Sequence, residues 1–186
     1  MKRTITLFFG MVLVQSIFSQ PKSSIPGYII TMNNDTISGY ILVDTKGNIG
    51  YISSIKCWDP ISKKGRNYGA DKTKAFGYGD RYFESLVWDG THNYFERIVK
   101  GSPVALYVTA STSPGLIIPV KITHNEYFIV DNSSMTRLQR MGFKKFMMNY
   151  VKSCSVLKDR LETEKLGYNN LVEIIQEYNL CSSNNK

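Results

Sequence analysis

Short β-favouring runs alternate with turn residues from Gly27 to about Arg140, and no helical periodicity persists over three turns in this part of the chain. The tetrapeptide Asn33-Asn34-Asp35-Thr36 separates two apolar runs, and asparagine and aspartate tolerate the positive φ angles of tight hairpins. Asp89-Gly90 gives a second strong turn signal. About ten short strands are expected: Tyr28–Met32, Ile37–Val43, Ile49–Ile55, Ala75–Tyr78, Tyr82–Trp88, Tyr94–Val99, Val104–Thr109, Leu116–Ile122, Glu126–Val130 and Met135–Arg140.

Two places interrupt the strand pattern. Residues 56–74 are rich in charged and turn-forming residues, among them Asp59-Pro60, which favours a loop or an irregular hairpin. His124-Asn125 reads as a turn between the last long runs.

The hydrophobic period changes after Gly142. Apolar residues then recur at the spacing of one face of a helix: Phe143, Phe146, Met147, Tyr150, Val151 and Cys154. A second helix is predicted to start near Ser153 or Ser155 and to carry Val156, Leu157 and Leu161. A third is predicted from about Tyr168 to Tyr178, with Leu171, Ile174, Ile175 and Tyr178 as its apolar stripe.

These patterns predict an α+β protein with an antiparallel β-rich domain followed by two or three C-terminal helices. The β-rich part is expected to be a curled sheet, a sandwich or a small barrel, since hydrophobic alternation does not distinguish these three forms. The expected organisation is a signal peptide at 1–19, a short linker at 20–26, a β domain at 27–140, a packed helical segment at 141–180 and a polar tail at 181–186.

The first nineteen residues have the pattern of a secretory signal peptide. Lys2 and Arg3 precede an apolar run from Ile5 to Val14, and Ser19 supplies a small residue before the expected cleavage site. The run is too short to span a membrane, and no long apolar stretch follows it. We therefore expect a mature chain without a transmembrane segment, exported to the periplasm or the medium, with peripheral attachment to the outer membrane as a further option.

The chain of 186 residues carries 23 Lys and Arg against 15 Asp and Glu, a formal charge of +8. Removing residues 1–19 takes away Lys2 and Arg3 and no acid, so the mature charge is +6. A basic protein associates with anionic surfaces. Outside the cytoplasm this favours an envelope protein, an anionic glycan or anionic lipid as the partner, and it argues against nucleic acid.

The sequence gives little support to catalysis. His92 and His124 are its two histidines, and each is expected in an exposed turn. Phosphate-binding loops, nucleophile elbows and zinc-protease helices are all missing from the sequence. We expect no cofactor, no metal site and no catalytic residue.

One cluster of charge suggests binding. Arg137, Arg140, Lys144, Lys145 and Lys152 place five positive charges within sixteen residues, with no acid between them. Such a face could hold phosphate or carboxylate groups. The alternative is a solvated surface of the first helix.

Three cysteines leave a choice of states. Cys154 and Cys181 could pair in an oxidising compartment and tie the first C-terminal helix to the end of the third. The alternative is two thiols, with Cys154 a small core residue. Cys57 is left over if the other two pair.

The chain resembles a group of small exported proteins of unknown function from Bacteroidota. The resemblance rests on Gly27-Tyr28-Ile29-Ile30-Thr31, Asn34-Asp35-Thr36-Ile37-Ser38-Gly39, Phe143-Lys144-Lys145-Phe146 and Glu177-Tyr178-Asn179. It covers nearly all of the mature chain and implies the envelope of a Gram-negative bacterium. It supplies no catalytic residue.

The sequence therefore favours an exported, non-catalytic envelope protein that acts by binding or by structural association. Two alternatives remain open at this point: a hydrolase of envelope polymers, and a protein attached peripherally to anionic membranes.

Overall fold

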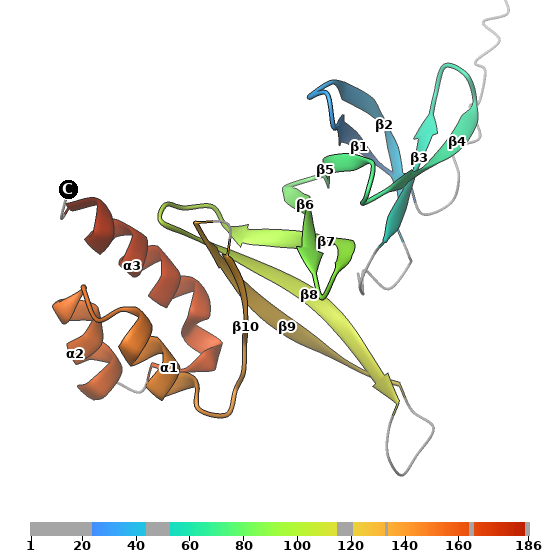
Figure 1. Cartoon of the computed structure of the whole chain (residues 1–186). Helices are drawn as coiled ribbons and strands as arrows, with labels where there is room; N and C mark the ends of the chain where they lie inside the picture. The colour runs from blue at the N-terminus through green and yellow to red at the C-terminus, as the bar shows by residue number, and fades with distance from the viewer. Residues whose placement is uncertain (1–23, 44–52, 115–120, 133, 164–165, 185–186) are drawn as a thin grey trace, which may run out of the picture.

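The computed structural model describes residues 24–43, 53–114, 121–132, 134–163 and 166–184, and the side chains of residues 110–124 lie outside this description. The expected signal peptide and the Ile49–Ser53 part of the third expected strand fall largely outside the described ranges. The described chain forms an antiparallel sheet followed by helices, which confirms the α+β class (Figure 1).

In the part of the chain that the structure describes, ten strands form one open sheet in the order β10-β9-β8-β7-β6-β5-β1-β2-β3-β4. Of the three forms expected, the structure therefore has the curled open sheet. Every neighbouring pair is antiparallel. The strands are β1 (Ser24–Thr31), β2 (Thr36–Leu42), β3 (Ser54–Asp59), β4 (Lys64–Gly69), β5 (Thr73–Tyr78), β6 (Arg81–Trp88), β7 (Thr91–Val99), β8 (Val104–Pro114), β9 (Lys121–Asp131) and β10 (Ser134–Leu138).

Strand β1 lies inside the sheet, between β2 and β5. At this place the backbones approach closely, because a Cβ atom on Gly27 would lie 2.4 Å from the Gly77 carbonyl oxygen and 2.7 Å from the Ile41 side chain. Only glycine fits such a position. Gly27 therefore allows the first strand to join two series of sequential hairpins.

The N-terminal strands curl around a core of their own. Its largest buried side chains include Phe76, Phe83 and Tyr94, with the Phe76 and Phe83 rings stacked at 4.5 Å. The Tyr94 hydroxyl reaches the Tyr68 carbonyl oxygen of β4 at 3.4 Å, and the Ser85 hydroxyl donates to the Ala70 carbonyl. These bonds hold the connection between β4 and β5 against β6 and β7.

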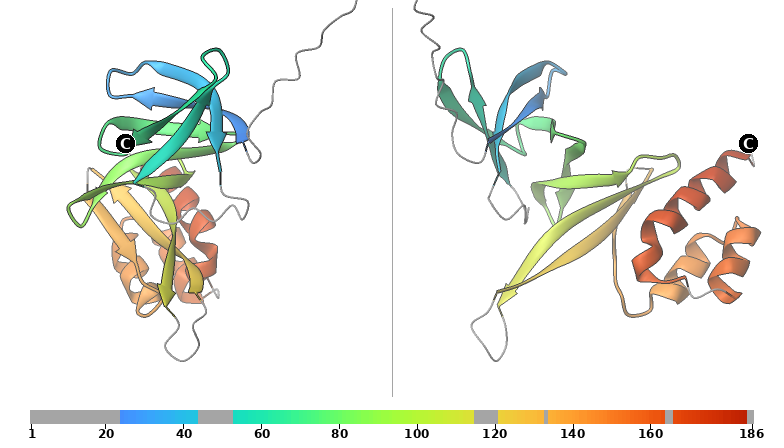
Figure 2. Two further views of the ribbon diagram at one scale, coloured as in Figure 1. Left: turned by 90° about the vertical axis from the view of Figure 1, so that its right-hand side faces the viewer. Right: turned by 180° about the vertical axis from the view of Figure 1, so that it is seen from behind.

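The helices cover one face of strands β7 to β10 (Figures 1 and 2). They are α1 (Phe143–Tyr150), α2 (Ser155–Thr163), the 3₁₀ turn η1 (Tyr168–Asn170) and α3 (Leu171–Asn184). Their buried apolar residues meet Val104, Leu106 and Ile129 of the sheet. We call this the helix face of the sheet, and the opposite side the outer face.

The helical prediction is confirmed with three corrections. Phe146 stays 38% exposed and Val156 70% exposed, so neither belongs to a buried stripe. Phe146 instead stacks on Tyr150 at 5.7 Å. The helix α3 continues to Asn184, so the expected polar tail is helical over Cys181–Asn184.

Of the two forms expected for residues 56–74, the structure has the hairpin: these residues form most of β3 and β4 and the start of β5. The strand prediction needs two further corrections. His124-Asn125 is no turn, since both residues lie within the long strand β9. The expected linker 20–26 includes Ser24–Pro26 of β1. The expected strand Leu116–Ile122 lies mostly outside the described residues.

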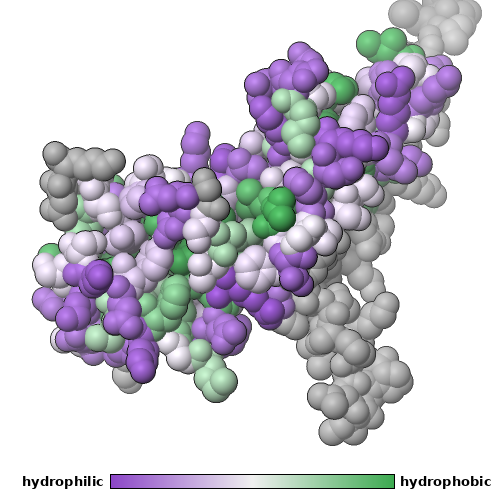
Figure 3. Space-filling view, in the orientation of Figure 1, coloured by the Kyte–Doolittle hydropathy of each residue, from purple (hydrophilic) through white to green (hydrophobic). Residues whose placement is uncertain are grey.

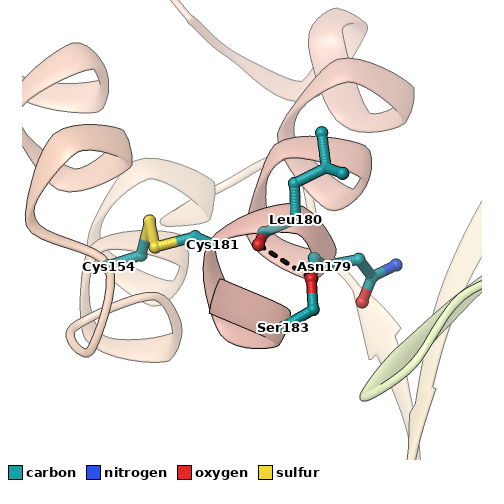
Figure 4. The surroundings of a disulfide bond; sticks show 5 residues. All are labelled: Cys154, Asn179, Leu180, Cys181 and Ser183. Carbon is teal, nitrogen blue, oxygen red and sulfur yellow. Dashed lines mark hydrogen bonds between the residues drawn. A yellow bond between two sulfur atoms is a disulfide. The ribbon is translucent and has the colours of Figure 1, made fainter. Parts of the chain in front are cut away.

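The helical segment is fastened by covalent and polar contacts. Cys154 and Cys181 form a disulfide with a Cα–Cα distance of 6.0 Å, which ties the α1–α2 connection to α3 (Figure 4). The Asn179 side chain accepts from the Val104 N–H at 3.0 Å and donates to the Val104 carbonyl at 2.8 Å, so α3 is also joined to β8. Arg160 of α2 pairs with Glu173 of α3 at 2.9 Å.

A polar cluster lies on the outer face of the central strands. Arg97 pairs with Glu84 at 3.3 Å and lies 4.2 Å from the centre of the Tyr82 ring. The Tyr107 hydroxyl donates to the same Glu84 carboxylate. Burial, and next this hydrogen bond, raise the pKa of Tyr107 far above its ordinary value.

We predict that removing the disulfide lowers the free energy of unfolding by about 3–4 kcal/mol, because its loop spans 27 positions of the unfolded chain. Urea unfolding would compare the oxidised protein, the reduced protein and the C154S/C181S double variant. The last two should share one midpoint, and reductant should leave the double variant unchanged. An unaltered midpoint on reduction would contradict the prediction.

Tyr107 should make stability sensitive to alkali. Its pKa in the folded protein lies above the ordinary value of 10.0, so its contribution is complete below pH 10 and is lost as the pH rises towards the folded pKa. Tyr107→Phe should therefore show a smaller fall in unfolding free energy between about pH 9 and pH 11 than the wild type. Urea titrations across that range measure both slopes, and equal slopes would refute the assignment.

Candidate functional site

The basic residues expected to form one binding face have different surroundings in the fold. Arg137 pairs with Glu126 at 2.8 Å across the outer face of β9 and β10. Arg140 lies 4.9 Å from the centre of the Tyr168 ring. Two of the five basic side chains are thus engaged with neighbours outside α1.

The remaining three lie in or just after α1. Lys144 donates to the Glu162 carbonyl of α2 at 3.2 Å, while Lys145 and Lys152 are exposed. The exposed part of Phe146 lies on the same helix. Hydrophilic and apolar residues are interspersed over the helical segment, at the left of Figure 3.

The chain's two histidines are the candidates for acid–base catalysis in the sequence, and the structure describes the surroundings of one of them, His92. His92 is exposed on β7, and its Nδ1 lies 3.5 Å from the Ser85 hydroxyl. The side chain of His124 falls outside the described residues. Among those that are described, no three His, Cys, Asp or Glu side chains are grouped so that they could hold a metal ion. The described helices are each too short or too polar to cross a bilayer.

Cys57 is a buried thiol on β3. Burial, and next the nearby Asp59 carboxylate, raise its pKa above the ordinary value. A thiol whose pKa is raised holds its proton and is a weak nucleophile at neutral pH. Cys57 therefore behaves as a small core residue, packed over Gly39.

The most unusual geometry of the described chain lies between β2 and β3. Although β2 has seven residues and β3 has six, their register contains only Tyr40↔Trp58 and Ile41↔Cys57. From Tyr40 back towards Thr36, the hairpin of β1 and β2 diverges from the hairpin of β3 and β4, as Figure 1 shows at its upper right. We call the space between Thr36–Gly39 and the turn at Asp59–Lys63 the seam.

Backbone groups of β2 point into the seam, and their identity follows from the β1–β2 hairpin. The Thr31 N–H donates to the Asp35 carbonyl at 2.9 Å, and the ladder begins with the pair Ile30↔Thr36. Thr31 and Asp35 continue this register by one residue, so they form a hydrogen-bonded pair and Ile30↔Thr36 is a non-hydrogen-bonded pair. The two kinds of pair alternate along an antiparallel ladder.

The hydrogen-bonded pairs with β1 therefore fall at Ile37 and Gly39. The N–H and C=O of Ser38 point the other way, towards β3. Tyr40 has the same orientation, and its backbone faces its partner Trp58. Within the described residues no strand pairs with Ser38 on that side.

Proline explains why the pairing stops. Continuing the register from Tyr40↔Trp58 would place Pro60 opposite Ser38. Pro60 has no N–H to donate to the Ser38 carbonyl, so the next pair of the ladder would lose one of its two hydrogen bonds. The chain turns away instead, and the Asp59 carboxylate accepts hydrogen bonds from the Ile61 N–H at 2.8 Å and the Ser62 hydroxyl at 2.7 Å.

Two cavities open on either side of the seam. One, of about 360 Å³, is mainly apolar; the other, of about 120 Å³, is more polar. Ser38 and Asp59 line both cavities. The larger is also lined by Pro26, Gly27, Gly39, Tyr40, Pro60 and Ile61, and the smaller by Ile37, Cys57, Arg66 and Tyr68.

Charge around the seam is mainly positive. The hairpin Ser54–Gly69 carries Lys56, Lys63, Lys64 and Arg66 against one acid, Asp59. The hydrogen bond from the Ser62 hydroxyl, and next that from the Ile61 N–H, hold the pKa of Asp59 below its ordinary value. Asp59 is therefore ionised at neutral pH and stays engaged in its turn.

Sequence reasoning did not find the seam, although one signal for it was present. The dipeptide Asp59-Pro60 marks the point at which the pairing ends, but its meaning depends on which residue of β2 it would face. Comparison with protein-family models, curated proteins and solved structures finds no match to the chain. The function proposed below is derived from the residues of the chain.

Amide hydrogen exchange should reveal the unpaired strand. We predict that the Ser38 amide exchanges at least about tenfold faster than those of Ile37 and Gly39, which donate to β1. Replacing Pro60 by threonine restores an N–H opposite Ser38 and should slow its exchange. Exchange measured by NMR in both proteins tests this, with Ile37 and Gly39 as internal controls. Equal protection of all three amides in the wild type would contradict the assignment.

Proposed function

We propose that the protein is an exported, non-catalytic binding protein of the cell envelope and that the seam is its binding site. The observation that carries the proposal is that, among the described residues, no strand pairs with Ser38 on the side that faces β3, where its backbone borders two cavities. An N–H and a C=O on a strand edge form strong hydrogen bonds with any suitable partner.

The surroundings of the seam suit binding. Ile61 is 92% exposed at the tip of the β3–β4 turn, and it borders the larger cavity together with Pro60 and Tyr40. An exposed apolar residue beside an apolar cavity gives a partner surface to bury. The site stands on two hairpins whose other sides are fixed by full ladders.

Two features support export. The first nineteen residues have the pattern of a signal peptide, and the disulfide of Cys154 with Cys181 is of the kind that persists in oxidising compartments. The resemblance to exported Bacteroidota proteins points to the same setting. The net charge of +6 expected for the mature chain adds a weak attraction to anionic envelope components.

Site-specific crosslinking in the native cells tests the proposal. A photoreactive amino acid at Ile61 should give a discrete adduct that survives a high-salt wash, while the same group at Val156, exposed on α2, should not. Mass spectrometry of the recovered protein should find Gln20 at its N-terminus in an extracytoplasmic fraction.

The Pro60→Thr variant is the second control, because it should close the seam and remove the adduct without changing export. Identical adducts at Ile61 and Val156 would contradict a binding site at the seam. Recovery from the cytoplasm with residues 1–19 still attached would contradict export. Loss of the Ile61 adduct in high salt would favour a purely electrostatic association through basic residues such as Lys145.

A further inference from the structure

We propose that the seam binds an extended peptide segment of a partner protein by strand addition, with Ser38 of β2 supplying the backbone hydrogen bonds. This inference rests on the proposed function and names its ligand class. An added strand would occupy the place that β3 leaves when it turns away at Pro60.

The backbone of Ser38 is the feature most specific to strand addition. The Ser38 N–H and C=O point to the same side with the spacing of a ladder pair, which is the pattern that an antiparallel strand satisfies with one residue. The neighbours Ile37 and Gly39 are bonded to β1, so the edge is already held in extended conformation. This edge is therefore already ordered in the free protein, so binding a peptide does not lose its conformational entropy.

The cavities agree with a strand as the ligand. Successive side chains of a strand point to opposite faces, and the two cavities lie on either side of Ser38. The larger cavity would take an apolar side chain against Pro26, Tyr40 and Pro60, and the smaller would take a polar one near Arg66. Backbone bonds then give affinity and the alternating side chains give specificity.

Charge selects among peptides. The β3–β4 hairpin carries four basic residues and one acid, and the pKa of that acid, Asp59, is lowered by its own turn. An acidic residue at the polar positions of the peptide would complement this charge. The expected ligand thus alternates apolar residues with polar or acidic ones.

Selection from a phage library of random seven-residue peptides provides the probe. The purified protein should enrich peptides in which apolar and polar or acidic residues alternate. The best peptide is then synthesised with a single N-methyl group at each position in turn. Methylation of amides that face Ser38 should weaken binding at least about tenfold, whereas methylation of the alternate amides should change it less than about twofold.

Variants of the protein supply matched controls. Ser38→Pro removes the N–H that faces the seam and should weaken binding at least about tenfold, since proline is tolerated where an edge N–H is unpaired. Ser38→Thr keeps the N–H and should restore binding, and Val156→Asp on α2 should leave it unchanged. The methylation series uses the wild-type protein and so does not depend on how any variant folds.

Three results would overturn strand addition. The first is a failure to enrich any peptide, and the second is binding that is equally sensitive to methylation at all positions. The third is a concentration-dependent dimer that Ser38→Pro abolishes, which would make the seam an interface between two copies of the chain. If the Ile61 adduct in cells persists under any of these results, binding at the seam stands and only the ligand class fails.

Discussion

The position of β1 inside the sheet is the constraint on which the rest of the structure depends. The first strand pairs on one side with its sequence neighbour β2 and on the other with β5, more than forty residues later. Gly27 allows this because no side chain larger than hydrogen fits against the Gly77 carbonyl and the Ile41 side chain. The N-terminal core depends on that pairing, because its buried side chains come from strands on both sides of β1.

Local signals predicted most of the elements. Asn33 to Thr36 specified the first hairpin, and the spacing of Leu171, Ile174 and Ile175 specified the face that α3 buries, because both depend on residues close in sequence. The sheet order was not predictable, since the pairing of β1 with β5 depends on how distant side chains meet. The exposure of Val156 was likewise decided by the packing of α2 against its neighbours.

The candidate site likewise has features that depend on residues close in sequence and features that depend on distant contacts. The basic cluster was found from sequence because charge is visible there, but the sequence did not show that Arg137 pairs with Glu126. The seam was missed because its main feature is a backbone group, and the chemistry of Ser38 follows from register rather than from residue type. Pro60 became informative only once its position opposite Ser38 was known.

The burial of Cys57 has a consequence for oxidative folding. Three thiols allow three different single disulfides, and two of those would join the sheet wrongly to the helical segment. Cys57 lies in the core that the N-terminal strands form among themselves, whereas Cys154 and Cys181 belong to the core against the helices. Thiol–disulfide exchange needs an accessible thiolate, and Cys57 is buried with a raised pKa. Once the N-terminal strands have folded, Cys154 and Cys181 are therefore the pair that an oxidant joins.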